Sequence, residues 1–178
     1  SGTVQNFANY MIQTVGGRWT DNGTWATALG QSPVGVSAAQ NQGVVSRLSQ
    51  TKFSIAIADP ADIKKAKLPV VSVRNASGEF VKPTAGTAGR FIAAQKVEAN
   101  GLIKFNYKAK VRGAYPITLV AYGLAPTASS KPAKAAAVKD YFTYIINTCG
   151  PKSAARGGYV AISGSLKNKA LELIARIK

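Results

Sequence analysis

The apolar residues at the start of the chain repeat with the period of an α-helix. They fall at positions i, i+3, i+4, i+7 and i+8, which is one apolar face of an amphipathic helix, and they are Val4, Phe7, Ala8, Met11 and Ile12. Ser1 or Thr3 would stand at the N-cap of this helix. The pattern therefore predicts an amphipathic helix that begins within the stretch SGT.

Helix-like and strand-like stretches alternate along the rest of the chain. Helical spacing marks residues 37–50, 85–99, 131–149 and a last helix with Leu166, Ala170, Leu173, Ile174 and Ile177 on its inner face. Alternating or continuous apolar residues predict strands over 52–59, 102–107 and 115–125, the first of them well buried. The turn residues 75–78 predict a short hairpin, and Gly150-Pro151 predicts the end of the longest helix. This alternation predicts an α/β fold.

Charge and composition narrow the function. The 178 residues hold 23 Lys and Arg against 7 Asp and Glu, a net charge of +16, and almost all of the excess lies after residue 60. Such a balance favours an anionic partner. With no histidine and one cysteine, the chain lacks the residues for Ser-His-Asp and Cys-His nucleophiles and for an intrachain disulfide. Cys149 is in phase with the apolar face of the longest helix, which predicts a core thiol. No apolar run is long enough for a membrane span.

The SGT stretch allows two interpretations. Ser and Thr before a helix usually act as plain caps. The first turn of a helix also presents backbone N–H groups and a partial positive charge, so that Gly2 and the flanking hydroxyls could hold an anion.

Several stretches in one order resemble the phosphate-binding proteins of ABC phosphate transporters. They are SGTVQNFANYM, NQGVVSRLSQTKFSIAIAD, GEFVKPT, YPITLVAYGLA, AVKDYFTYIINTCG and GGYVAISGSLKNKALELI. The resemblance implies a type II periplasmic-binding-protein fold, with a mixed sheet and helices on both faces. It also implies a periplasmic or extracellular protein, without cofactor or enzymatic activity, that delivers inorganic phosphate to an ABC transporter permease. The phosphate-binding residues that carry over are Ser1, Gly2 and Thr3.

The resemblance further implies that this chain corresponds to the C-terminal half of such a protein. Residues 1–58 would form part of the SGT-bearing lobe, 59–70 a crossing segment, and 71–178 part of the second lobe. The remaining phosphate ligands of the family, an arginine among them, would lie in the N-terminal half. Sheet edges left open by its absence predict either pairing with a separate N-terminal half or self-association.

Three other functions fit parts of the sequence. A binding-protein-like module that lacks a small ligand could use the basic surface to bind an anionic polymer or a partner protein. Nucleic-acid binding fits the charge, but most of the seven tyrosines fall in apolar positions that predict burial, and no nucleic-acid-binding motif is present. Ser49 and Lys52 match the S-x-x-K spacing of penicillin-recognising enzymes without the partner motifs, which favours a non-enzymatic helix end.

Overall fold

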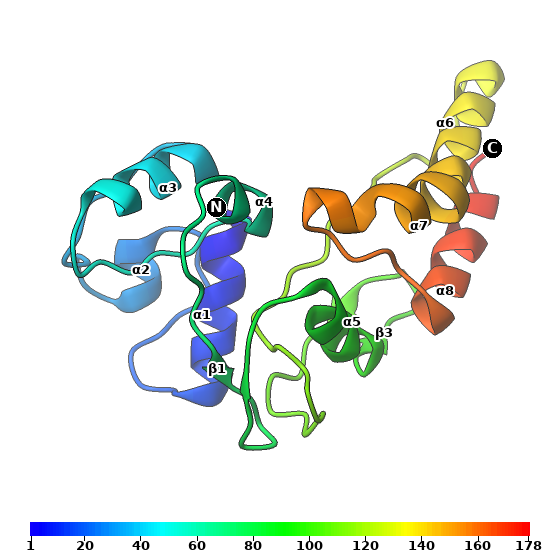
Figure 1. The fold of residues 1–178 in the computed structure, drawn as a ribbon. Helices are drawn as coiled ribbons and strands as arrows, with labels where there is room; N and C mark the ends of the chain where they lie inside the picture. The colour runs from blue at the N-terminus through cyan, green and yellow to red at the C-terminus, as the bar shows by residue number, and fades with distance from the viewer.

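The computed structural model describes all residues 1–178, which form eight α-helices, one π-helix, one 3₁₀-helix and four short strands. In chain order the elements are α1 (Gly2–Thr14), α2 (Trp25–Leu29), α3 (Gln40–Gln50), α4 (Pro60–Lys65), β1 (Val73–Arg74), β2 (Phe80–Val81), α5 (Ala85–Ala93), β3 (Lys96–Val97), β4 (Ile103–Lys104), α6 (Pro132–Tyr144), η1 (Ile145–Cys149), α7 (Gly150–Ser153), η2 (Ala154–Gly157) and α8 (Gly164–Ala175). Helices α1 to α4 lie on one side of the molecule and α5 to α8 on the other (Figure 1).

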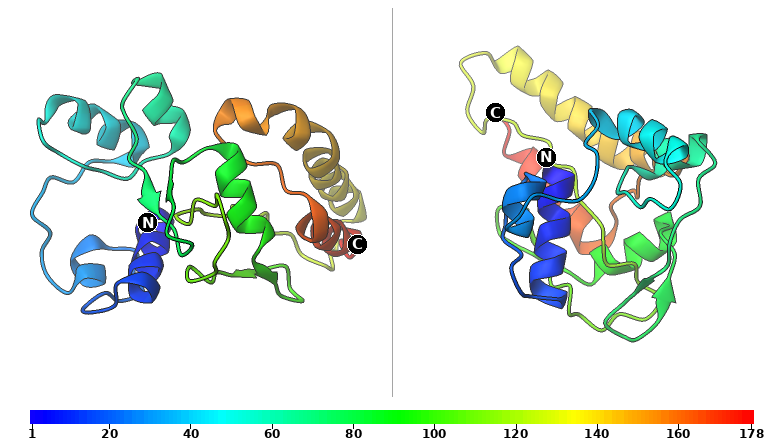
Figure 2. Two further views of the ribbon diagram at one scale, coloured as in Figure 1. Left: turned by 60° about the horizontal axis from the view of Figure 1, so that its bottom comes forward. Right: turned by 90° about the vertical axis from the view of Figure 1, so that its left-hand side faces the viewer.

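The predicted first helix is present as α1, and its apolar face packs on the aromatic loop that follows it. Ala8 is fully buried. Phe7 meets Trp19 edge-on at 5.7 Å between ring centroids and lies at the same distance from Trp25. Trp25 is also the first residue of α2, so the same contacts fix the short helix against α1. Figure 2 shows α1 beside α2 in both of its views.

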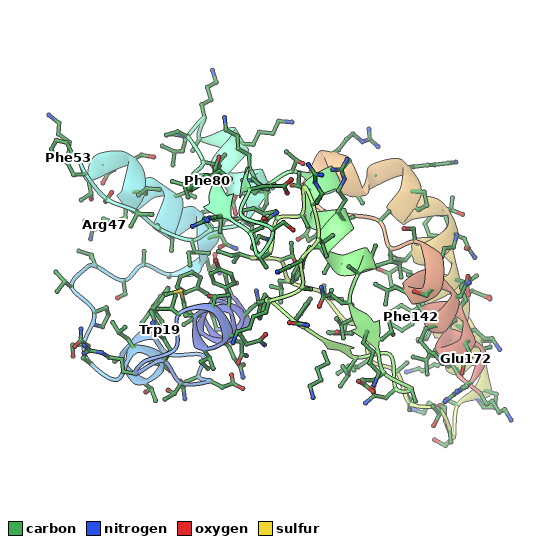
Figure 3. The ribbon with its side chains drawn as sticks, turned by 90° about the horizontal axis from the view of Figure 1, so that it is seen from below. Trp19, Arg47, Phe53, Phe80, Phe142 and Glu172 are labelled. Atoms are coloured by element: carbon green, nitrogen blue, oxygen red, sulfur yellow. The ribbon has the colours of Figure 1, made fainter.

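The stretch 52–59 is not the buried strand that its alternation predicts. Helix α3 forms as predicted, with Val45 buried, but the chain beyond it is irregular. Phe53 is fully exposed and Ile55 is 81% exposed. Figure 3 shows Phe53 at the outer edge of the molecule, beyond the end of α3. The prediction is wrong because a strand needs a neighbour for its backbone groups, and none lies beside this stretch.

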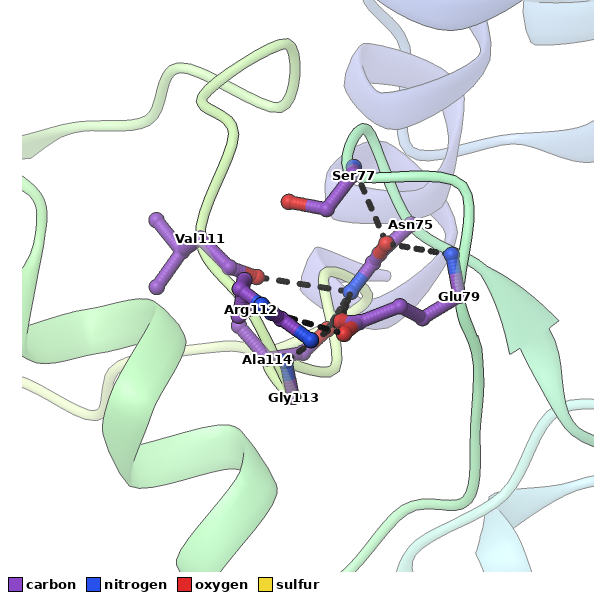
Figure 4. Close-up of polar contacts among 7 residues, drawn as sticks. All are labelled: Asn75, Ser77, Glu79, Val111, Arg112, Gly113 and Ala114. Carbon is purple, nitrogen blue, oxygen red and sulfur yellow. Dashed lines mark hydrogen bonds and ion pairs between the residues drawn. The ribbon is translucent and has the colours of Figure 1, made fainter.

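The predicted hairpin at residues 75–78 forms between β1 and β2, and one buried side chain organises it. Strands β1 and β2 pair antiparallel, with Val73 opposite Val81. The Asn75 carbonyl oxygen accepts hydrogen bonds from the backbone N–H groups of Ser77 and Glu79, each at 3.0 Å. Its amide donates to the backbone carbonyls of Val111 and Ala114 and to the Glu79 carboxylate (Figure 4). This cluster ties the hairpin to the loop 111–114.

An aromatic core lies beneath α5. The helix begins with a capping box, in which Thr84 and Thr87 each bond the other's backbone N–H. Phe91, which is 1% exposed, stacks with Phe105 and Tyr107 at centroid distances of 6.0 and 5.7 Å. The predicted strand 102–107 is shorter than expected: only Ile103–Lys104 pairs, with β3. Its aromatic residues leave the ladder and enter this core.

The longest helix does not stop at Gly150-Pro151 as predicted. Helix α6 continues into the π-turn η1, in which the Gly150 N–H bonds the Ile145 carbonyl, and Pro151 then enters the first turn of α7. Proline is tolerated there because its missing N–H would lie in a first turn. The chain leaves helical structure at Gly158, with φ +77°.

The inner face predicted for the last helix is confirmed. Leu166, Ile174 and Ile177 are buried, and the last two form a second core cluster with Ala135 of α6. Cys149 is only half-buried, so the predicted core thiol lies at the margin of the packed region. Tyr141 is 59% exposed on the same helical run. The face of α6 is partly uncovered for this reason.

The α/β class is confirmed, but the chain does not itself form a larger mixed sheet. The strands make two separate two-stranded hairpins, and the predicted strand 115–125 is irregular. Only 16 of 178 residues are buried. Four of the seven tyrosines, expected to be buried, are more than 36% exposed: Tyr122, Tyr141, Tyr144 and Tyr159. Much of the apolar surface that the sequence encodes therefore has no cover within the chain.

Candidate functional site

The first turn of α1 combines a cap with unpaired hydrogen-bond donors. The Ser1 side-chain oxygen accepts from the Val4 N–H at 3.3 Å, and the Ser1 carbonyl accepts from the Gln5 N–H at 3.1 Å. The N–H groups of Gly2 and Thr3 have no partner, nor has the Thr3 hydroxyl. Ser1 is therefore a helix cap, while Gly2 and Thr3 leave donors available to a ligand.

Gly2 and Thr3 also have the surroundings that an anion needs. A Cβ placed on Gly2 would meet nothing within 4 Å. Thr3 is half-buried and lines a large cleft. Unpaired N–H groups and the positive end of the helix dipole stabilise a negative charge at such a turn. The three predicted residues thus lie together, with different roles: Ser1 closes the helix, and Gly2 and Thr3 face open space.

Asp21 is the acidic group bound to α1, and it lies on a different face of the helix. Its carboxylate accepts from the Gln5 side chain at 2.8 Å and from the Asn9 side chain at 3.1 Å. Neither of these residues nor Asp21 lines the cleft. The carboxylate anchors the following loop to α1 and leaves the Thr3 side of the first turn without a negative charge.

Amide side chains fix the orientation of α1 against the loop 105–118. Asn6 donates to the Thr118 carbonyl at 2.9 Å and accepts from the Tyr107 hydroxyl at 2.8 Å. Gln13 donates to the Phe105 carbonyl and accepts from the Tyr107 N–H, both at 3.0 Å. Burial raises the pKa of Tyr107 to about 12, so that the phenol stays a donor at neutral pH. Burial, with a smaller contribution from Tyr10, also raises the pKa of Tyr115.

Thr118 carries a buried polar atom without a partner. It is 8% exposed, its hydroxyl makes no hydrogen bond, and it lines the same cleft as Thr3. The sequence offers a signal for Asn6, which is one helical turn after Thr3 and so on the same face. It offers none for Thr118, because the predicted strand around it gives no information on which side meets α1.

The cleft itself is large, apolar and nearly free of basic groups. Its volume is about 2070 Å³, and 32 of its 54 lining residues are hydrophobic. Residues from the first turns of α1, α3, α4, α5 and α8 line it. Lys64 is its one basic residue and no arginine lines it, although the chain holds 23 Lys and Arg. Its polar groups are therefore mainly neutral donors and acceptors.

The two sides of the molecule meet at Gly158. A Cβ at this position would lie 3.1 Å from the Ala61 N and 3.3 Å from the Pro60 Cβ. The turn after η2 thus approaches the start of α4 closely, as Figure 1 shows for the end of the α7 run. No group of three or more Asp, Glu or Cys side chains lies close enough together to hold a metal ion. None of the helices has the length and apolar character that a bilayer crossing requires.

These features define a class before any comparison: an α/β chain in which a helix start with unpaired donors faces a cleft. No family model matches the sequence. A phosphate-binding protein PstS of Xylella fastidiosa (strain Temecula1 / ATCC 700964) is 31% identical over 169 residues, which is 93% of this chain and 45% of that protein. Another, from Methanocaldococcus jannaschii, is 27% identical over 198 residues, 100% of this chain and 49% of that protein. A third, from Pasteurella multocida (strain Pm70), is 27% identical over 155 residues, 81% of this chain and 42% of that protein.

The chain is therefore homologous to phosphate-binding proteins PstS over most of its length. It spans about half the length of the curated relatives that it matches. The resemblance noted from its motifs is confirmed by these independent matches.

Proposed function

We propose that this chain takes part in the capture of inorganic phosphate, as a portion of an extracytoplasmic solute-binding protein that serves an ABC importer. The protein would have the type II periplasmic-binding-protein fold, and the chain would supply its C-terminal half. Residues 1–58 would belong to the SGT-bearing lobe, 59–70 to the crossing segment and 71–178 to the second lobe. Binding, not catalysis, is the activity.

The observation that carries this proposal is the first turn of α1. The N–H groups of Gly2 and Thr3 and the Thr3 hydroxyl are unpaired, and they stand at the positive end of a 13-residue helix beside the cleft. The homologues are named for phosphate binding. A phosphate oxygen at this turn would accept hydrogen bonds from donors that are already oriented, so little further ordering is needed.

Neutral donors alone would leave a phosphate incompletely bound. The cleft contributes no arginine and only Lys64 as a basic group. We therefore expect this turn to supply one wall of the phosphate site and the complementary part of the protein to supply the rest. The Thr118 hydroxyl, buried and unpaired in the same cleft, is a candidate for a further donor.

The test uses the Xylella fastidiosa relative with its matched region replaced by this chain. Isothermal titration with inorganic phosphate should give saturable binding. Thr3→Val removes the hydroxyl at nearly constant volume and should weaken binding at least about 10-fold, the effect of one lost hydrogen bond to a charged group. Gly2→Ala should weaken it as well, because the added Cβ occupies the open space through which the anion approaches.

Two controls separate a binding role from a structural one. Gly2 has an ordinary helical φ and no neighbour within 4 Å, so Gly2→Ala should leave the melting temperature unchanged or raised. Ser165→Ala removes another cleft hydroxyl near a helix start and should leave phosphate affinity unchanged. Equal affinity in the wild-type chimera and Thr3→Val would contradict the role given to the SGT turn.

The placement of the basic residues supports a second candidate function. Of the 23 Lys and Arg, all but Lys64 lie outside the cleft. A smaller pocket of about 420 Å³ has Arg74 and Lys108 in its wall. An anionic cell-surface polymer or a partner protein could bind this outer surface, and the exposed tyrosines keep nucleic acid as a third candidate. Retention on a polyphosphate or DNA column that falls steeply with salt, and that Thr3→Val leaves unchanged, would distinguish these functions from phosphate capture.

A further inference from the structure

Four extended apolar segments line the cleft and have no structural partner. They are residues 54–58, 69–72, 117–121 and 159–162, and all four contribute to the cleft wall. Each presents an exposed aliphatic side chain: Ile55 is 81% exposed, Val71 59%, Leu119 55% and Val160 39%. These sequences are rich in β-branched residues, which favour strands. The cleft therefore collects the four stretches that most resemble unpaired strands.

The backbones of these segments are as open as their side chains. Residues 54–58, 69–72, 119–121 and 160–162 take part in no backbone–backbone hydrogen bond. More than nine in ten buried backbone groups are paired in native proteins. Backbone groups that are unpaired along a row of apolar side chains form a template for an added strand. The segments thus need the same thing twice over: an apolar cover and a hydrogen-bonding neighbour.

The cleft is unsuited to a polyanion and too large for a small ligand alone. Lys64 is its one basic residue, against Asp59 and Asp62, in a chain of net charge +16. A nucleic acid or an anionic polymer would find its counter-charges elsewhere on the surface. Small-molecule pockets measure roughly 300–1,000 Å³, whereas this cleft measures about 2070 Å³. Its chemistry fits the apolar interior of a folded polypeptide.

We propose that the four segments are the docking surface for the portion of a PstS-like protein that this chain does not match, which adds strands to them and completes the sheets. The relatives supply the length required: 45% to 49% of each is matched, so slightly more than half remains. The inference rests on the same homology as the proposed function but does not depend on phosphate binding. The two can therefore fail separately.

The experiment compares backbone protection with and without the complementary portion. Amide hydrogen exchange is measured by mass spectrometry on the chain alone and on the Xylella fastidiosa relative whose matched region is replaced by this chain. Peptides that cover residues 54–58, 70–72, 117–121 and 159–162 should exchange almost as an unfolded chain in the first sample. In the second they should exchange at least about 100-fold more slowly. Peptides of α8 should change little.

A mixture of this chain with the separately produced unmatched portion of the same relative gives an independent test. Ile55→Lys places a charge in the cleft and should abolish both the protection and the complex. Val34→Lys is the matched control, because Val34 is fully exposed but does not line the cleft.

Each result decides for or against the proposal. Protection of the segments in the chimera or in the mixture, with loss in Ile55→Lys alone, supports it. The proposal is overturned if neither sample protects them, if Val34→Lys is as harmful as Ile55→Lys, or if the chain alone protects them through a second copy. Protection without phosphate binding would leave this inference standing and refute the function proposed above.

Discussion

Asn75 shows how a single buried side chain can hold two loops in register. It is 7% exposed, and each of its amide atoms serves at least two partners. An apolar replacement would strand several of these groups away from water, and unsatisfied buried groups each cost about 1–3 kcal/mol. The geometry in Figure 4 therefore assigns Asn75 a larger share of stability than its exposed turn sequence suggests.

Asn75→Ala should lower the free energy of unfolding by about 2–4 kcal/mol, because the hairpin loses its bonds to Val111 and Ala114. Urea denaturation followed by circular dichroism measures the change. Ser77→Ala is the control: the Ser77 side chain makes no hydrogen bond, and its loss should cost less than about 0.5 kcal/mol. A similar cost for both variants would refute the importance given to the Asn75 amide.

Tyr107 predicts a pH dependence at the alkaline end. Burial raises its pKa to about 12 from the ordinary value of 10.0, so the folded state holds the phenolic proton more tightly than the unfolded state. The stabilisation is complete below pH 10 and is lost as the pH rises toward 12, by about 2 kcal/mol at most.

Denaturation at pH 8, 10 and 11.5 measures this dependence. Tyr107→Phe keeps the aromatic stack and should show a smaller decline above pH 10, although it is less stable at pH 8 through loss of the bond to Asn6. If wild type and Tyr107→Phe decline in parallel, another group is responsible.

At the scale of elements, periodic patterns identify helices well and isolated strands poorly. The apolar faces of α1 and α8 are read directly from the sequence because a helix satisfies its own backbone. Residues 52–59 and 115–125 have strand-like sequences, yet their ladders require neighbours that no local pattern reveals. Pro151 was expected to end a helix, but the π-turn before it absorbs the missing N–H.

The candidate site divides in the same way. Ser1, Gly2 and Thr3 are contiguous, so one helix start predicts their juxtaposition. Thr118 and Tyr107 reach α1 through contacts across more than 100 residues, and only the tertiary structure brings them there. Spacing along the sequence has no means of predicting such contacts.

Helix α5 offers a test of a local signal. The Thr84 hydroxyl accepts from the Thr87 N–H at 3.1 Å, and the Thr84 N–H donates to the Thr87 hydroxyl at 2.9 Å. Thr84→Ala should therefore cost about 1 kcal/mol in thermal or chemical denaturation. Ser46→Ala, at an exposed position inside α3, should be neutral or slightly stabilising. Equal stability of Thr84→Ala and wild type would show that the capping box contributes nothing to α5.

For the whole molecule, charge and apolar exposure act in opposite directions. A net charge of +16 makes copies of the chain repel one another, while the uncovered cleft segments favour association. Salt weakens the first effect, since the Debye length falls from about 30 Å at 0.01 M to about 8 Å at 0.15 M. Apolar burial is not screened.

The isolated chain should therefore be monomeric at low ionic strength and associate as salt is added, which light scattering at 0.01 and 0.5 M sodium chloride measures. Ile55→Lys should raise the salt concentration required, because it adds a charge to the cleft itself. Val34→Lys adds the same charge outside the cleft, so it controls for the change in net charge. Association that salt reverses would instead indicate ion pairing between copies, and the apolar segments would then have no part in it.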